Sequence, residues 1–146
     1  MSLSERWRAK IDHYQEQIDS LQIPENPSEV QLKQLASRIN ELHGRASFDY
    51  GRAKSEYFRV EQLISTTEAE NKRGNNEDER KKNAIEACKG FETKDGRIID
   101  LYDAKSEAYY RKTMMEEIVK HLKSVIQSLT LSYGVVKMEI DLQKQM

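Results

Sequence analysis

Apolar residues recur along most of the chain at gaps of three and four, which is the spacing of one face of an α-helix. The first segment carries them at Leu3, Trp7, Ile11, Tyr14, Ile18 and Leu21. We therefore expect a helix over about 3–22. Pro24 and Pro27 follow it, and neither can continue the hydrogen-bond ladder of a helix interior.

A second, long helix is predicted over about 28–72, with Ser28 as N-cap and Glu29 in the first turn. A run of turn-forming residues, Arg73-Gly74-Asn75-Asn76, ends it. Its seam extends over more than four heptads, as in a coiled coil. The seam residues are Leu32, Leu35, Ile39, Leu42, Ala46, Asp49, Ala53, Tyr57, Val60 and Ile64.

The second half predicts a short helix over 77–89, ending before Gly90, and a long helix over about 98–131. Residues 135–146 either continue this last helix or form a separate tail. We predict a loop over 91–99, with a small hairpin as the alternative because Asp95-Gly96 is a hairpin signal. The seam of the last helix is Leu101, Ala104, Ala108, Arg111, Met115, Ile118, Leu122, Val125 and Leu129.

These elements predict an all-α fold in a single helical domain over 1–146. Two long helices form an antiparallel, coiled-coil-like hairpin, and the shorter helices pack on it as a helical bundle. Only 2 Pro and 6 Gly occur in 146 residues, which disfavours an all-β fold with its many turns. Leu, Ile, Val and Phe make up about 21% of the chain, just above the level typical of disorder. The core should therefore be narrow, and we expect a second copy of the chain to complete it.

Two polar residues, Asp49 and Arg111, interrupt the seams. The segment Ala53-Lys54-Ser55-Glu56 recurs at 104–107, and if the two copies face each other in an antiparallel pair, Asp49 meets Arg111. A polar pair inside a seam fixes register at some cost in stability. The alternative is that both residues are solvated at the seam edge.

Aromatic and methionine side chains are enriched at protein interfaces. The candidate oligomer-interface residues are Trp7, Tyr14, Tyr109, Tyr110 and Met114. They predict a homo-oligomer, with a dimer as the first expectation, and a protein partner. The alternative is that they fill the bundle.

Residues 72–97 hold eight Lys or Arg and six Asp or Glu, although the net charge of the chain is −1. The candidate phosphate contacts are Arg80, Lys81, Lys82 and Lys89. They allow DNA as a partner through nonspecific, salt-sensitive contacts. The alternative is a solvated helix face.

No catalytic, cofactor-binding or metal-binding pattern emerges. The three histidines lack Glu three residues before them, and Cys-x-x-Cys is absent. The single cysteine, Cys88, has the setting of a packed thiol. We expect a protein that is not an enzyme, with no cofactor and no evident small-molecule substrate. No apolar run is long enough to span a membrane and no secretory leader is recognised, so we expect a cytoplasmic protein with no membrane partner.

Four segments together carry a resemblance to known proteins: FDYGRAKSEYFRVEQLI, AIEACKGF, LYDAKSEAYYRKTMMEEI and LKSVIQSLTLS. They resemble small all-helical proteins encoded by tailed bacteriophages, some of them encoded near replication or recombination genes. The resemblance implies a viral protein of the host cytoplasm in a DNA-metabolism setting, and it carries no site residues.

The expected function is that of a non-enzymatic, oligomerising interaction or scaffold protein, accessory to phage DNA replication or recombination. Nonspecific DNA binding through residues 72–97 is the alternative. An enzyme of unrecognised type is a third.

Overall fold

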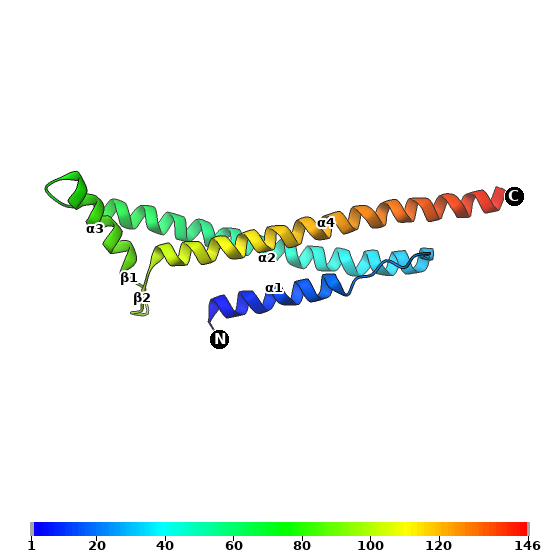
Figure 1. The fold of residues 1–146 in the computed structure, drawn as a ribbon, viewed down its shortest axis with the longest axis horizontal. Coiled ribbons are helices and arrows are strands. Elements are labelled where there is room, and N and C mark those ends of the chain that lie inside the picture. Colours follow the sequence, from blue (N-terminus) through cyan, green and yellow to red (C-terminus); the bar gives the residue numbers. More distant parts are fainter. Residues whose placement is uncertain (1, 146) are drawn as a thin grey trace. The chain divides into compact units, whose positions relative to one another are not determined.

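The computed structural model describes residues 2–145, which form four helices and one small hairpin (Figure 1). The helices and strands in chain order are α1 (Leu3–Asp19), α2 (Glu29–Glu70), α3 (Glu77–Lys89), β1 (Phe91–Glu92), β2 (Ile98–Ile99) and α4 (Leu101–Gln145). The predicted all-α class is confirmed. Among the described residues, no helix is apolar over a stretch long enough to cross a membrane.

The helix boundaries follow from local capping. Ser2 and Glu5 form a reciprocal capping box at the start of α1. Ser28 caps α2 as predicted, accepting from the backbone N–H of Gln31 at 3.1 Å. Asn76 caps α3 in the same way, accepting from the N–H of Glu79 at 2.8 Å.

Two expected boundaries are corrected. The first helix ends at Asp19 rather than near residue 22, because the last turn is closed by backbone hydrogen bonds from the N–H of Ser20 to Glu16 and from the N–H of Leu21 to Ile18. The last helix begins at Leu101 rather than near residue 98. The Asp100 carboxylate caps it by accepting from the backbone N–H of Tyr102 at 2.9 Å.

The segment predicted as a loop over 91–99 forms the alternative, a two-stranded antiparallel hairpin in which Phe91 pairs with Ile99. Gly96 has a φ of +83° in its turn, a conformation that favours glycine. The hairpin rests on other elements, since Phe91 and Ile99 pack against the buried residues Ile64, Cys88 and Leu101. That support stabilises strands too short to persist alone.

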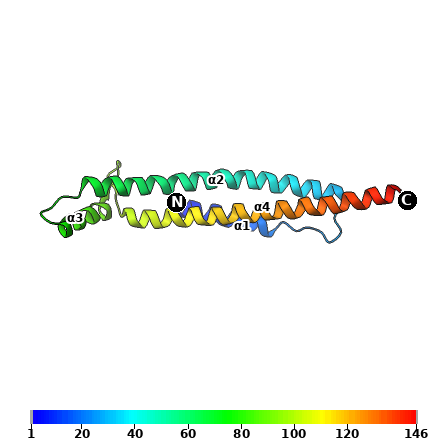
Figure 2. The same ribbon diagram turned by 90° about the horizontal axis from the view of Figure 1, so that it is seen from above.

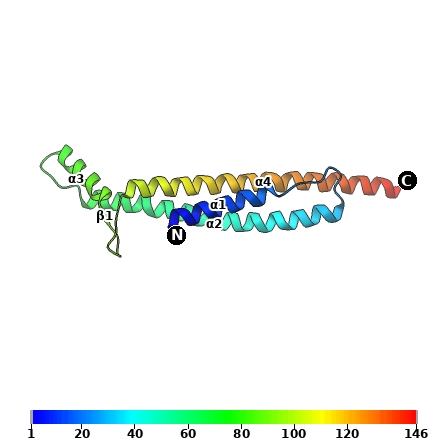
Figure 3. The same ribbon diagram turned by 60° about the horizontal axis from the view of Figure 1, so that its bottom comes forward.

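The contacts divide the chain into two compact units, and α2 and α4 each run through both. The first unit comprises the residues up to Tyr50 together with those from Met114 onward, and the second comprises Gly51–Thr113. Within each unit α2 and α4 lie side by side and antiparallel (Figures 2 and 3), which confirms the predicted hairpin of long helices.

The predicted seams form the core of both units. In the first unit α1 packs on α2 and α4 through Trp7, Ile11 and Tyr14. The buried seam residues of this unit are Leu32, Ile39, Leu42, Ala46, Asp49, Met115, Ile118, Leu122 and Leu129. In the second unit they are Ala53, Ile64, Leu101, Ala108 and Arg111.

Candidate interaction surface

The C-terminal part of α4 carries an exposed apolar stripe. Residues 135–145 continue α4 rather than forming a separate tail. Leu131, Val135, Met138 and Leu142 are 73%, 56%, 66% and 59% exposed. Their gaps of four, three and four place them on one face of the helix. We call these four residues the α4 stripe.

The opposite face of the same segment turns toward the bundle. Leu129 is buried, and Tyr133, Val136 and Ile140 are half-buried. Tyr133 donates its hydroxyl to Glu29 at the start of α2, at 3.2 Å. Beyond this contact α4 continues past the beginning of α2 (Figure 1). The segment is therefore apolar on two sides, and the chain itself covers one of them.

Sequence reasoning missed the α4 stripe although its spacing was readable. Ser128, Ser132 and Gly134 weaken the helical signal around residues 128–134. The predicted inner seam ends at Leu129. A second period at 131, 135, 138 and 142, offset from that seam, was the signal that could have revealed the stripe.

The candidate oligomer-interface residues divide into two groups. Trp7 and Tyr14 are buried inside the first unit, so they fill the bundle and offer no free surface. Tyr109 and Tyr110 are about half exposed and Met114 is half-buried. Burial of Trp7 and Tyr14 follows from their place on the apolar face that fixes α1 to its neighbours.

The predicted register residue Asp49 is buried and serves α1. Its carboxylate accepts a 2.6 Å hydrogen bond from the Tyr14 hydroxyl and pairs with the Lys10 ammonium at 3.2 Å. Burial, together with the hydrogen bond to Asp49, holds the pKa of Tyr14 well above its ordinary value. Asp49 therefore joins two helices of the first unit through neutral and charged donors.

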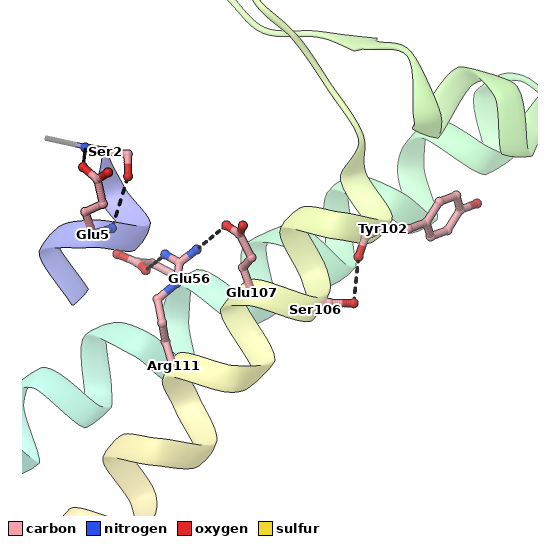
Figure 4. Close-up of polar contacts among 7 residues, drawn as sticks. All are labelled: Ser2, Glu5, Glu56, Tyr102, Ser106, Glu107 and Arg111. Atoms are coloured by element: carbon pink, nitrogen blue, oxygen red, sulfur yellow. Dashed lines mark hydrogen bonds and ion pairs between the residues drawn. The ribbon is translucent and has the colours of Figure 1, made fainter. Parts of the chain in front are cut away.

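The other register residue, Arg111, is buried in the second unit (Figure 4). Its guanidinium lies 3.3 Å from the Glu56 carboxylate on α2 and 3.6 Å from Glu107 on its own helix. Asp49 thus pairs with Lys10, and Arg111 pairs with Glu56 and Glu107. Direct pairing of Asp49 with Arg111 stays a prediction. Neither residue is a solvated seam-edge residue.

An aromatic and cationic cluster lies near Arg111 in the second unit. The rings of Tyr57 and Tyr109 are 5.7 Å apart and tilted by 55°. The Lys112 ammonium lies 4.8 Å from the centre of the Tyr57 ring. Such contacts hold the lysine against the two rings by cation–π attraction.

The four candidate phosphate contacts are all exposed on α3. Lys81 pairs with Glu77 at 3.3 Å and Lys82 with Glu86 at 4.0 Å, each one helical turn away. The Arg80 guanidinium donates to the backbone carbonyl of Asn76. Intrahelical carboxylates thus offset part of the positive charge of this face, although exposed pairs of this kind are weak.

The single cysteine of the chain, Cys88, is buried. The Cys88 thiol is buried beside Ile64, and burial raises its pKa. A neutral, enclosed thiol is a poor nucleophile. No cluster of three or more metal-ligating side chains occurs among residues 2–145. A groove of about 270 Å³ between α2 and α4 in the first unit is lined largely by apolar side chains, among them Leu32, Ile126 and Leu129.

Comparisons with protein-family models, with curated proteins and with solved structures found no match to this chain. A function for this chain is therefore inferred from its own sequence and surfaces.

Proposed function

We propose that this chain is a non-enzymatic, oligomerising interaction or scaffold protein that assembles through the α4 stripe. One observation carries the proposal: four large apolar side chains, each more than half exposed, lie at heptad spacing on one face of a helix. Single exposed apolar residues are common on protein surfaces, but contiguous apolar patches mark interaction sites.

The arrangement suits a helical partner. A helix that presents an a/d stripe buries it best against another helix with similar spacing. The long α2–α4 hairpin of the first unit supports the segment through Leu129 and Tyr133, so the stripe is held in helical form before a partner arrives. Such pre-organisation lowers the entropic cost of binding.

The test is the molar mass of the protein as a function of concentration, measured by sedimentation equilibrium. We expect wild type to exceed its monomer mass of 17.1 kDa at about 10–100 μM. Val135→Glu should abolish this rise, because it places a charge in the middle of the stripe. Lys144→Glu is the matched control, since it changes charge at an exposed position off the stripe and should leave the mass unchanged.

The setting of this assembly rests on the sequence resemblance alone. On that basis we propose an accessory role in phage DNA replication or recombination. Nonspecific DNA binding through residues 72–97 is the second candidate, favoured by the exposure of Arg80, Lys81, Lys82 and Lys89. A gel shift at about 50 mM salt tests it, and Lys81→Glu with Lys82→Glu should abolish any shift.

A further inference from the structure

We propose that the partner of the α4 stripe is the same stripe of a second copy of this chain, with the two α4 helices antiparallel. This inference rests on the proposed function and adds the identity and direction of the partner. In this arrangement Leu131 of one copy packs against Leu142 of the other, and Val135 packs against Met138.

The position of the stripe allows such a dimer without rearrangement. Leu131, Val135, Met138 and Leu142 lie on the side of α4 opposite to its buried residues, because one residue advances the helix by about 100°. A second helix can therefore approach the stripe without displacing α1 or α2. Nothing in the first unit has to open.

The spacing of the stripe is self-complementary. The gaps of four, three and four are the same when the helix is followed in the reverse direction. In two antiparallel copies, each of the four stripe residues consequently packs against an apolar stripe residue of the other copy. An isologous interface with two-fold symmetry requires this arrangement. Both copies use the same patch, so the contact closes as a dimer.

The exposed area sets the scale of the interface. The four side chains are 56–73% exposed, but the stripe is smaller than a standard interface, to which each partner contributes about 20–30 residues. Flanking residues such as Ser132 and Glu139 add to it in a helix pair. A dimer of this size fits micromolar rather than nanomolar affinity.

The residues before the stripe favour the antiparallel direction. The same heptad positions of α4 continue toward its N-terminus with Ser128, Ser124, His121 and Glu117, all exposed. In a parallel dimer Glu117 would face Glu117 of the other copy. In the antiparallel dimer the paired segment is centred on residues 136–137, and the like charges lie at opposite ends of it. Like-charge juxtaposition is unfavourable, so the antiparallel direction is preferred.

Disulfide trapping distinguishes the two directions. The single-cysteine additions Leu131→Cys and Leu142→Cys retain the central pair of Val135 and Met138. The native Cys88 is buried and so does not compete. In the antiparallel dimer the two copies of residue 131 lie about 16 Å apart along the helix axis, beyond the roughly 7 Å that a disulfide spans.

The two variants are oxidised separately and as an equimolar mixture, and the products are identified by non-reducing electrophoresis and mass spectrometry. We expect the 131–142 disulfide to form in the mixture at least about tenfold faster than the disulfide of either variant alone. Lys137→Cys serves as the collision control, because its side chain lies off the stripe.

Rapid disulfide formation by Leu131→Cys alone would overturn the antiparallel direction and indicate a parallel dimer, while the proposed scaffold function would stand. Concentration-dependent assembly with no crosslink above the Lys137→Cys level would overturn the second copy's stripe as the partner. A wild-type mass of one monomer at every concentration would instead contradict the proposed function itself.

Discussion

Asp49 interrupts an apolar seam and yet is buried, which requires compensating donors because a buried, unpaired carboxylate is costly. The Tyr14 hydroxyl and the Lys10 ammonium supply them, and both come from α1. The carboxylate thereby ties α1 to α2. In the second unit Arg111 ties α4 to α2 through Glu56 in a similar way.

Tyr14→Phe removes the hydroxyl that Asp49 accepts from and leaves the packing of the ring in place. We expect the free energy of unfolding to fall by about 1.5–3 kcal/mol, the range for hydrogen bonds to charged groups. Urea denaturation followed by circular dichroism measures it. Tyr110→Phe is the control at a half-exposed tyrosine and should change stability by less than about 0.5 kcal/mol. Equal losses in the two variants would contradict the assigned role of Asp49.

Stability should decrease in alkaline solution. The pKa of the Cys88 thiol lies above its ordinary 9.0 in the folded chain, chiefly because of burial. Burial, with the hydrogen bond to Asp49, likewise raises the pKa of Tyr14 above its ordinary 10.0. The unfolded chain releases these protons at lower pH than the folded chain, so rising pH favours unfolding.

We therefore expect the free energy of unfolding to fall as the pH rises from about 8 to about 10.5. Denaturation curves at several pH values measure this slope, and Tyr14→Phe should make it shallower. A free energy that stays constant or increases over this interval would show that these groups do not ionise more readily in the unfolded chain.

The sequence predicted which residues are buried better than it predicted their partners. Periodicity placed Asp49 and Arg111 in the seams, where both are buried. It suggested that they pair with each other, which stays a prediction, and it did not predict the contacts of Asp49 with Tyr14 and Lys10 or that of Arg111 with Glu56. Seam position follows from the helical period alone. The choice of partner depends on where α1 packs and on the reach of long side chains, and neither is encoded in the period.

At the scale of elements, α4 combines one inner and one outer apolar face. The inner face follows the predicted seam and ends in half-buried residues after Leu129. The outer face begins at Leu131 and has no cover among the described residues. A helix with two apolar faces requires a second neighbour to bury both.

Replacing a glycine in the interior of α2 by alanine should stabilise the protein. A Cβ added at Gly51 would meet nothing within 4 Å, and the residue lies in the interior of a helix. We expect Gly51→Ala to raise the free energy of unfolding by about 0.5–1 kcal/mol through a lower entropy of the unfolded chain. Thermal denaturation measures the change.

Gly96→Ala is the matched comparison, because Gly96 also has free space around it but has a φ of +83°. Strain at this turn should destabilise the protein by about 1 kcal/mol or more. Stabilisation by both substitutions would contradict the assigned turn conformation. Destabilisation by both would show that Gly51 is required for some reason other than helix propensity.

Element boundaries were predictable where a cap was explicit in the sequence. Ser28 and Gly90 mark helix ends that the structure shows within a residue. The hairpin over 91–99 was harder to predict, since its strands depend on packing against Ile64 and Leu101 rather than on their own propensity. Long-range support of this kind cannot be recognised in the local pattern.

At the scale of the whole molecule, the sequence contains few large apolar residues. They form two narrow cores, and the α4 stripe stays unburied. This distribution suits a protein that completes its structure by assembly.

The most direct test of this central claim is the molar mass of the wild-type protein in solution, measured by light scattering over a concentration range of about 1–100 μM. Assembly through the α4 stripe predicts a mass that rises from 17.1 kDa toward twice that value. A mass that remains at 17.1 kDa throughout the range would contradict it.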